Sequence, residues 1–157
     1  MEHIFYQLQQ KENIFHRPAL WTLGLSLWAA PAVAEPRRPT HVACVGDSIT
    51  AGSGASSPSK NYPSQLQLLL GDQVKVQNFG SSGCTMLSSG YGDKPYTLDP
   101  KYTAATDFVK AAPPGAVVSV IINLGANDSK PQNWDPPGKP KNDQQYLKDY
   151  RALVDHF

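Results

Sequence analysis

The feature that most constrains the fold is the order of the apolar segments after residue 40. Three short, strand-like segments at residues 41–45, 74–79 and 116–124 alternate with segments whose apolar residues recur at helical spacing. Strands that are separated by helices pair in parallel, through right-handed crossovers. The alternation therefore predicts an α/β fold in which helices cover both faces of a parallel sheet. The first strand, short and continuously apolar, is expected to be buried on both faces.

Three helices are predicted, which begin near Asn61, Asp99-Pro100 and Asn142, and the side chains of Asn61 and Asn142 can cap the helices that follow them. Gly71 would end the first helix, and Gln145 would answer the Asn142 cap. The apolar residues at helical spacing are Tyr62, Leu66, Leu69 and Leu70 in the first helix, Tyr102, Ala105, Phe108 and Val109 in the second, and Tyr146, Leu147, Tyr150, Leu153, Val154 and Phe157 in the third.

Residues 1–34 have the layout of a secretory signal peptide. Arg17 precedes an apolar stretch at residues 19–30, and the small residues that end at Ala34 mark the expected cleavage site. The stretch is shorter than the roughly 20 residues that span a bilayer. The alternative, a buried helix, would need an amphipathic stripe that the stretch lacks. We therefore expect a secreted or periplasmic protein without a stable membrane anchor, whose single domain covers residues 35–157.

Composition narrows the classes of partner. The formal net charge is +1 and there is no basic run, so nothing favours binding to nucleic acid or to an anionic membrane. Cys44 and Cys84 could form one disulfide in an oxidising compartment. Their positions, in mid-strand and in a loop, favour free, packed thiols instead. No cluster has the spacing of metal ligands, and we expect neither a metal nor a cofactor.

Polar residues follow each of the three predicted strands. "GDS" with Ser48 follows the first strand, "GSSG" with Gly83 follows the second, and "GAND" with Asn127 follows the third. The carboxyl ends of parallel strands share one edge of the sheet, where ligands bind. A hydroxyl, a backbone N–H without a neighbouring Cβ and a carboxamide would meet there, and acyl transfer needs a nucleophile and N–H donors for the oxyanion.

Each segment also has a structural interpretation. Gly-Asp-Ser is common in turns, "SSG" is typical of a flexible loop, and "GAND" is typical of a β-turn. The catalytic interpretation therefore depends on all three segments meeting at the same edge, in this order.

The strings "VGDSITAG", "NFGSSGCT" and "LGANDS" resemble blocks I, II and III of the SGNH (GDSL-type) hydrolases, in the family's order and roughly its spacing. The resemblance covers about residues 42–157 and implies a flavodoxin-like, three-layer α/β/α fold. It implies that Ser48 is the nucleophile and, through its N–H, an oxyanion donor. Gly83 would supply a second donor and the Asn127 side chain a third. Ala126 departs mildly from the family, which often has Thr or Gly there.

The longer string "GANDSKPQNW" is similar to secreted carbohydrate O-acetyl esterases, including sialate esterases. It implies hydrolysis of small acyl esters, most simply acetyl groups on sugars. Trp134 could stack on a sugar ring or could anchor its own loop. A lysophospholipase or thioesterase of the same family and a non-catalytic flavodoxin-like binding module remain alternatives, and the oligomeric state stays open.

The base that a serine nucleophile needs is missing from the pattern. The family takes its histidine from an Asp-x-x-His block, which this sequence lacks. His41 begins the first strand, and His156 lies near the end of the last helix, which runs away from Ser48. With three strands, the apolar third strand would be an exposed edge. We therefore expect a C-terminally incomplete SGNH domain, a truncated esterase that is weakly active or inactive.

Overall fold

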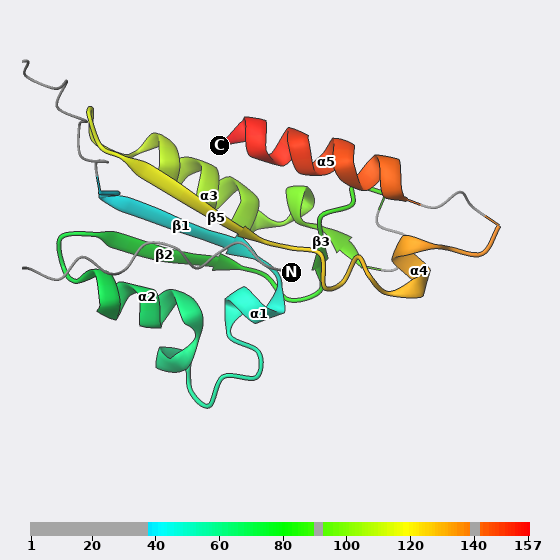
Figure 1. Cartoon of the computed structure of the whole chain (residues 1–157), viewed down its shortest axis with the longest axis horizontal. Coiled ribbons are helices and arrows are strands. Elements are labelled where there is room, and N and C mark those ends of the chain that lie inside the picture. Colours follow the sequence, from blue (N-terminus) through cyan, green and yellow to red (C-terminus); the bar gives the residue numbers. More distant parts are fainter. Residues whose placement is uncertain (1–37, 90–92, 139–141) are drawn as a thin grey trace, which may run out of the picture. The chain divides into compact units, whose positions relative to one another are not determined.

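The computed structural model describes residues 38–89, 93–138 and 142–157. The predicted signal peptide lies outside these residues. Within them, strands β1 (His41–Gly46), β2 (Lys75–Gly80) and β5 (Val118–Asn123) form a parallel sheet in the order β2-β1-β5 (Figure 1). The predicted parallel pairing is confirmed, and each strand lies within two residues of its expected bounds.

The register of the sheet brings the ends of all three strands to one level. Gly46 pairs with Gly80 on one side and with Asn123 on the other. Since the strands are parallel, the three segments that follow them leave the same edge of the sheet.

Helices cover both faces of the sheet, as the pattern predicts. In Figure 1, α1 (Ser48–Ala51) and α2 (Tyr62–Leu70) lie below it, and α3 (Pro100–Lys110) and α5 (Asp143–His156) lie above it. The result is the three-layer α/β/α arrangement. The remaining short elements are η1 (Pro58–Lys60), β3 (Cys84–Thr85), β4 (Lys94–Pro95), η2 (Tyr96–Leu98) and α4 (Pro131–Trp134).

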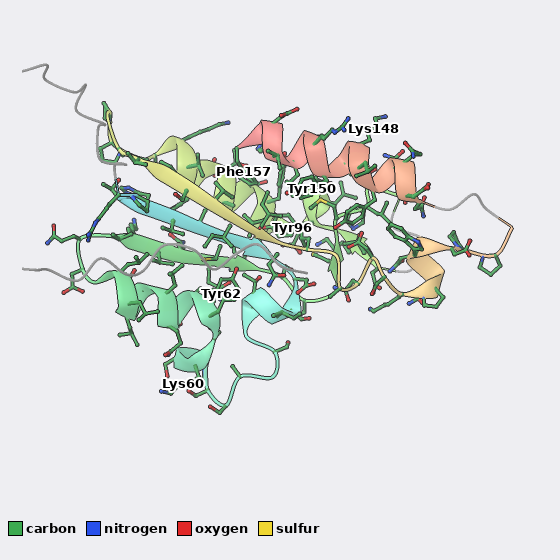
Figure 2. All side chains as sticks on the ribbon, in the orientation of Figure 1. Lys60, Tyr62, Tyr96, Lys148, Tyr150 and Phe157 are labelled. Carbon is green, nitrogen blue, oxygen red and sulfur yellow. The ribbon has the colours of Figure 1, made fainter. Side chains whose placement is uncertain are left out.

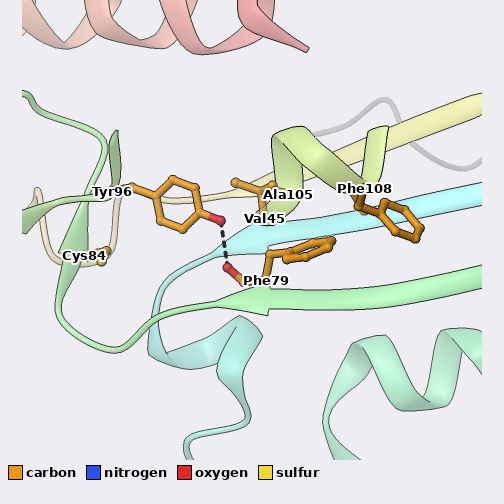
Figure 3. Close-up of a cluster of buried hydrophobic side chains, with 7 residues drawn as sticks. Val45, Phe79, Cys84, Tyr96, Ala105 and Phe108 are labelled. Atoms are coloured by element: carbon orange, nitrogen blue, oxygen red, sulfur yellow. Dashed lines mark hydrogen bonds between the residues drawn. The ribbon is translucent and has the colours of Figure 1, made fainter. Parts of the chain in front are cut away.

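Strand β1 is buried on both faces, as expected. Ala43 and Val45 belong to the apolar cluster under α3, which also contains Phe79 and Phe108 (Figure 3). Val42 and Cys44 point the other way, and the half-buried Tyr62 and Leu66 of α2 pack against them; Figure 2 shows Tyr62 between α2 and the sheet. Successive side chains of a strand alternate between faces, so one central strand supports both helical layers.

The three predicted helix starts are confirmed, and Asn61 caps its helix as predicted, but Asn142 stands at the N-cap position without a side-chain cap bond. Asn61 accepts a hydrogen bond from the Ser64 N–H at 2.9 Å, and Asp99 accepts one from the Lys101 N–H at 2.8 Å. The Asn142 side chain instead donates to the backbone carbonyl of Asn133 at 2.6 Å. A carbonyl in buried surroundings needs a donor, and that requirement takes the amide away from the helix. Gln145 likewise does not answer the cap.

Not every apolar residue of the helical patterns faces the core. Leu69 and Leu70 in α2 are 83% and 38% exposed, because they lie beyond Tyr62 and Leu66, the apolar residues of this helix that pack against the sheet. In α5, Leu153 is buried while Leu147, Tyr150 and Val154 are exposed. Strand β5 pairs with β1 alone among the described residues, and its Ile121 is 38% exposed. The expected exposed third strand is therefore confirmed for this part of the chain.

A short parallel pair, β3 with β4, was not expected from the sequence. It lies beyond the end of β2, and Tyr96 follows it directly. The buried Tyr96 hydroxyl donates to the carbonyl of Phe79 at 2.8 Å and so ties this loop to β2 (Figure 3). Cys44 and Cys84 are both buried free thiols, as expected, and burial raises the pKa of each.

Candidate active site

Two backbone hydrogen bonds join the segments that leave the sheet. The Ser81 N–H, just beyond β2, donates to the carbonyl of Gly46 at 2.9 Å. The Asp47 N–H, just beyond β1, donates to the carbonyl of Asn123 at 3.4 Å. The segments that carry Ser48, Gly83 and Asn127 are thus joined at their first residues.

Ser48 is the first residue of α1 and is half-buried. The Asp47 carboxylate caps this helix, because Oδ1 accepts the Ile49 N–H at 2.9 Å. Asp47 is 1% exposed, so its side chain lies beneath the turn and orients the start of α1. On the other side, the Asn78 side chain of β2 donates to the Thr50 carbonyl at 2.8 Å. Strands β1 and β2 thus both hold the helix that begins with Ser48.

Two glycines, Gly46 and Gly80, lie directly against α1. A Cβ on Gly46 would lie 2.0 Å from the Thr50 hydroxyl oxygen, and one on Gly80 would lie 2.1 Å from the Ala51 nitrogen. The short helix therefore lies directly on backbone at the ends of β1 and β2. From the sequence, both glycines could be identified as the ends of strands, but their contact with α1 could not be predicted.

Gly83 and Asn127 lie on segments that contact each other. The Asn127 side chain is 8% exposed, and its Nδ2 donates to the carbonyl of Cys84, the residue after Gly83, at 2.8 Å. Gly83 has a φ of +78°, a backbone conformation that favours glycine. The structure therefore brings these two predicted residues together, and Ser48 reaches the same edge of the sheet on α1.

Three donors at this edge have capacity for another acceptor. Among the described residues, neither the Ser48 N–H nor the Gly83 N–H donates a hydrogen bond. The carboxamide of Asn127 has two N–H protons, and one of them is engaged by Cys84. An oxygen that develops negative charge is the kind of acceptor that such donors stabilise in acyl transfer.

The two histidines of the described residues lie elsewhere. His41 begins β1, hydrogen bonds to Thr40 at 3.0 Å and contacts the Phe108 ring, at the opposite edge of the sheet from Ser48. His156 ends α5, where its Nε2 is 2.8 Å from the Thr106 hydroxyl of α3 and its ring lies 4.7 Å from that of Tyr102. Thr106 is seven residues into α3 from its Asp99 cap, about 10 Å from the edge where Ser48 lies.

Sequence reasoning placed Asp99 only at the start of a helix, but it also holds the loop that carries Gly83. Its carboxylate accepts from the Ser81 hydroxyl at 2.8 Å and from Lys94 Nζ at 3.0 Å. Burial by itself raises the pKa of Asp99, but hydrogen bonds from the Lys101 N–H, Lys94 and Ser81 outweigh it, so the pKa lies below its usual 3.8. Because Ser81 and Asp99 are 18 residues apart, no local sequence pattern could predict this contact.

Trp134 anchors its loop. Its half-buried ring packs edge-on against Tyr146 of α5, with centroids 5.7 Å apart. Its neighbour Asn133 is buried and donates to the carbonyl of Asn127 at 2.9 Å and to Asp93 at 2.8 Å. The segment after Asn127 is therefore fixed to the rest of the domain by polar and aromatic contacts.

In the part of the chain that the structure describes, no group of three or more His, Cys, Asp or Glu side chains could hold a metal ion. None of the helices in that part is long and apolar enough to cross a membrane.

The sequence of this chain is similar to that of a known protein family. Residues 44–157 match the GDSL-like lipase/acylhydrolase family. The chain is also 42% identical, over 121 residues, to an acetylxylan esterase of Xylanibacter ruminicola. That alignment covers 76% of this chain and 23% of the esterase, so the chain spans about a quarter of the length of that relative. The match to the family, over residues 44–157, spans all three predicted site residues. The chain belongs to the GDSL-like lipase/acylhydrolase (SGNH hydrolase) family.

Proposed function

We propose that this domain is a serine esterase in which Ser48 is the nucleophile and its own N–H, the Gly83 N–H and the Asn127 carboxamide bind the oxyanion. The observation that carries the proposal is the common level at which β1, β2 and β5 end, together with the hydrogen bond from Asn127 to the Gly83 loop. These contacts support a single site built from three segments far apart in the sequence. Membership of a family of acylhydrolases supports ester hydrolysis over a binding role.

In the proposed reaction, the Ser48 oxygen attacks the carbonyl carbon of the ester, and the carbonyl oxygen takes up the electron pair. The three N–H donors stabilise that oxygen, and the loss of one such donor commonly lowers turnover about 10²–10³-fold. The alcohol then leaves with a proton, and water releases the acid from Ser48. A base accepts the proton of Ser48 during the attack and returns it to the departing alcohol. His41 and His156 are engaged with Thr40 and Thr106, away from Ser48, so added imidazole takes this role in the test below.

For the substrate we propose a small acyl ester of a carbohydrate, acetyl first. The similarity to a protein named acetylxylan esterase supports this choice. Trp134 adds no support, because its ring is engaged with Tyr146.

The test is covalent labelling with a fluorophosphonate probe, with and without added imidazole as a substitute base. We expect labelling at Ser48 that imidazole accelerates, and no labelling of Ser48→Ala under the same conditions. Ser53→Ala is the matched control, since Ser53 is exposed and five residues along the same segment; it should be labelled like the unmodified protein. Equal labelling of Ser48→Ala would overturn the proposal, and no labelling of any variant would favour a non-catalytic binding module.

A second measurement addresses the substrate. The rate of Ser48→Ala with imidazole is the background, because imidazole itself hydrolyses these esters. After this background is subtracted, 4-nitrophenyl acetate should be hydrolysed faster than the octanoate ester. A preference for the octanoate would instead favour a lysophospholipase.

A further inference from the structure

Asp128 follows Asn127 and is 1% exposed. Its two carboxylate oxygens bind two successive backbone N–H groups. Oδ2 accepts from Met86 at 2.9 Å, and Oδ1 accepts from Leu87 at 2.7 Å. Hydrogen bonds to an ionised acceptor are roughly twice as strong as those between neutral groups. A buried carboxylate thus binds the backbone at the third and fourth residues after Gly83.

The Asn127 side chain binds the same segment two residues before Met86, where it donates to the carbonyl of Cys84. Two adjacent side chains therefore hold three backbone groups within residues 84–87. We call this Asn127–Asp128 pair the clamp; Asp128 contributes both of its carboxylate oxygens to it.

The position of Gly83 depends on such bonds. No atom outside its immediate neighbours lies within 4 Å of where its Cβ would be, so no packing holds it from that direction. The backbone bond across its turn, from the Cys84 N–H to the Ser81 carbonyl, is long at 3.4 Å. Shorter bonds restrain the loop on both sides of Gly83: Ser81 is held by Gly46 and Asp99 before it, and residues 84–87 are held by Asn127 and Asp128 after it.

We propose that Asp128 is a positioning residue for the oxyanion site. By binding Met86 and Leu87 it keeps the Gly83 N–H at a fixed distance from the Asn127 carboxamide, so that both donors reach one oxygen. This inference rests on the proposed function, because it assigns Asp128 a role in the geometry of that same site. A displacement of about 1 Å in such a site costs on the order of 10²-fold in rate.

The chemistry requires a carboxylate. In Asp128→Asn, only one oxygen remains as an acceptor, and the NH2 group faces an N–H that also needs an acceptor. One of the two bonds to the segment is therefore lost while the volume of the side chain is kept.

Asp149 of α5 offers a matched control. Its carboxylate accepts from the Ser88 N–H at 2.7 Å and from the Ser88 hydroxyl at 3.1 Å. The same substitution there, Asp149→Asn, loosens the same segment one residue further along, on the exposed side and away from Gly83 and Asn127.

The experiment measures the rate constant for fluorophosphonate labelling of Ser48, with imidazole present, in the unmodified chain, Asp128→Asn and Asp149→Asn. Samples are compared well below the Tm of each, so that only folded protein reacts. We expect Asp128→Asn to be labelled about 10- to 100-fold more slowly, and Asp149→Asn within about twofold of the unmodified chain. The maximal rate should fall, while the probe concentration that gives half the maximal rate stays constant.

Equal labelling of Asp128→Asn and the unmodified chain would overturn the inference and leave the proposed function intact. An equal loss in both variants would overturn it too, because general loosening would then explain the result. No labelling of the unmodified chain would contradict the proposed function itself. If Asp128→Asn does not fold, amide hydrogen exchange of the unmodified chain decides: Met86 and Leu87 must exchange more slowly than Ser88, and the reverse order refutes the clamp.

Discussion

Gly80, at the end of β2, lies so close to α1 that replacement by alanine should move the helix that carries Ser48. The added Cβ would lie 2.1 Å from the Ala51 nitrogen, 2.6 Å from the Thr50 carbonyl carbon and 2.7 Å from the Ala51 Cα. All three atoms belong to the backbone, so no side-chain rotation relieves the contact. Real Cβ atoms essentially never approach within 3.0 Å, so α1 would have to move by about 0.9 Å or more.

That movement acts on bonds that hold α1 in place. The Ala51 N–H donates to the Asp47 carbonyl at 3.0 Å, and the Thr50 carbonyl accepts from Asn78 at 2.8 Å. Overpacking of a well-packed site costs typically 1–3 kcal/mol, and a clash with backbone belongs at the upper end, so we expect Gly80→Ala to lose about 3 kcal/mol of unfolding free energy. Labelling of Ser48 should slow by at least about tenfold, since Ser48 moves with its helix.

Gly54→Ala separates the clash from the general cost of replacing a glycine. Gly54 has a φ of +83° and nothing within 4 Å of its Cβ position, so only the left-handed backbone is strained. That strain costs about 1–2 kcal/mol, and the labelling rate should stay unchanged. Urea denaturation gives both free energies. If Gly80→Ala loses no more stability than Gly54→Ala and labels at the normal rate, the close packing of α1 on β2 is refuted.

Two further predictions concern the loop beyond β2. Tyr96→Phe should cost about 1–2 kcal/mol in urea denaturation, because it removes a buried hydrogen bond to the Phe79 carbonyl; a neutral result would mean that this bond adds nothing. The lowered pKa of Asp99 means that its ionised form stabilises the fold above its usual pKa of 3.8 and that this contribution is lost as pH falls further. Between pH 5 and 2, thermal melts of Asp99→Asn should therefore lose less stability than those of the unmodified chain, and parallel curves would contradict this.

The sequence predicted most of the fold because its patterns are local. Alternating apolar segments identified the three strands, and Asn61 and Asp99 marked the starts of two helices. The absence of a side-chain cap bond from Asn142 could not be predicted, since the competing acceptor, the Asn133 carbonyl, becomes available only in the folded chain. The exposure of Leu69 likewise follows from which residues of α2 pack against the sheet, which a single-helix pattern does not record.

The candidate site divides in the same way. The positions of its three proposed groups were predictable, because each lies within four residues of the end of a strand and parallel strands end at one edge. The residues that fix those groups were not, because their partners lie far away in the sequence: Asp99 binds Ser81, and Asp128 binds Met86 across 42 positions. Gly80 carried no signal beyond a strand end, although its missing side chain is what lets α1 approach.

The bonds that hold the loop after Gly83 end mostly on its main chain: the Cys84 carbonyl and the N–H groups of Met86, Leu87 and Ser88. Any residue other than proline offers the same N–H and carbonyl groups at such positions. A substitution at a buried position such as Met86 or Leu87 can therefore change the packing of the loop without removing its main-chain anchors. Evolution could in this way vary the core beneath the loop while the proposed oxyanion donors stay in place.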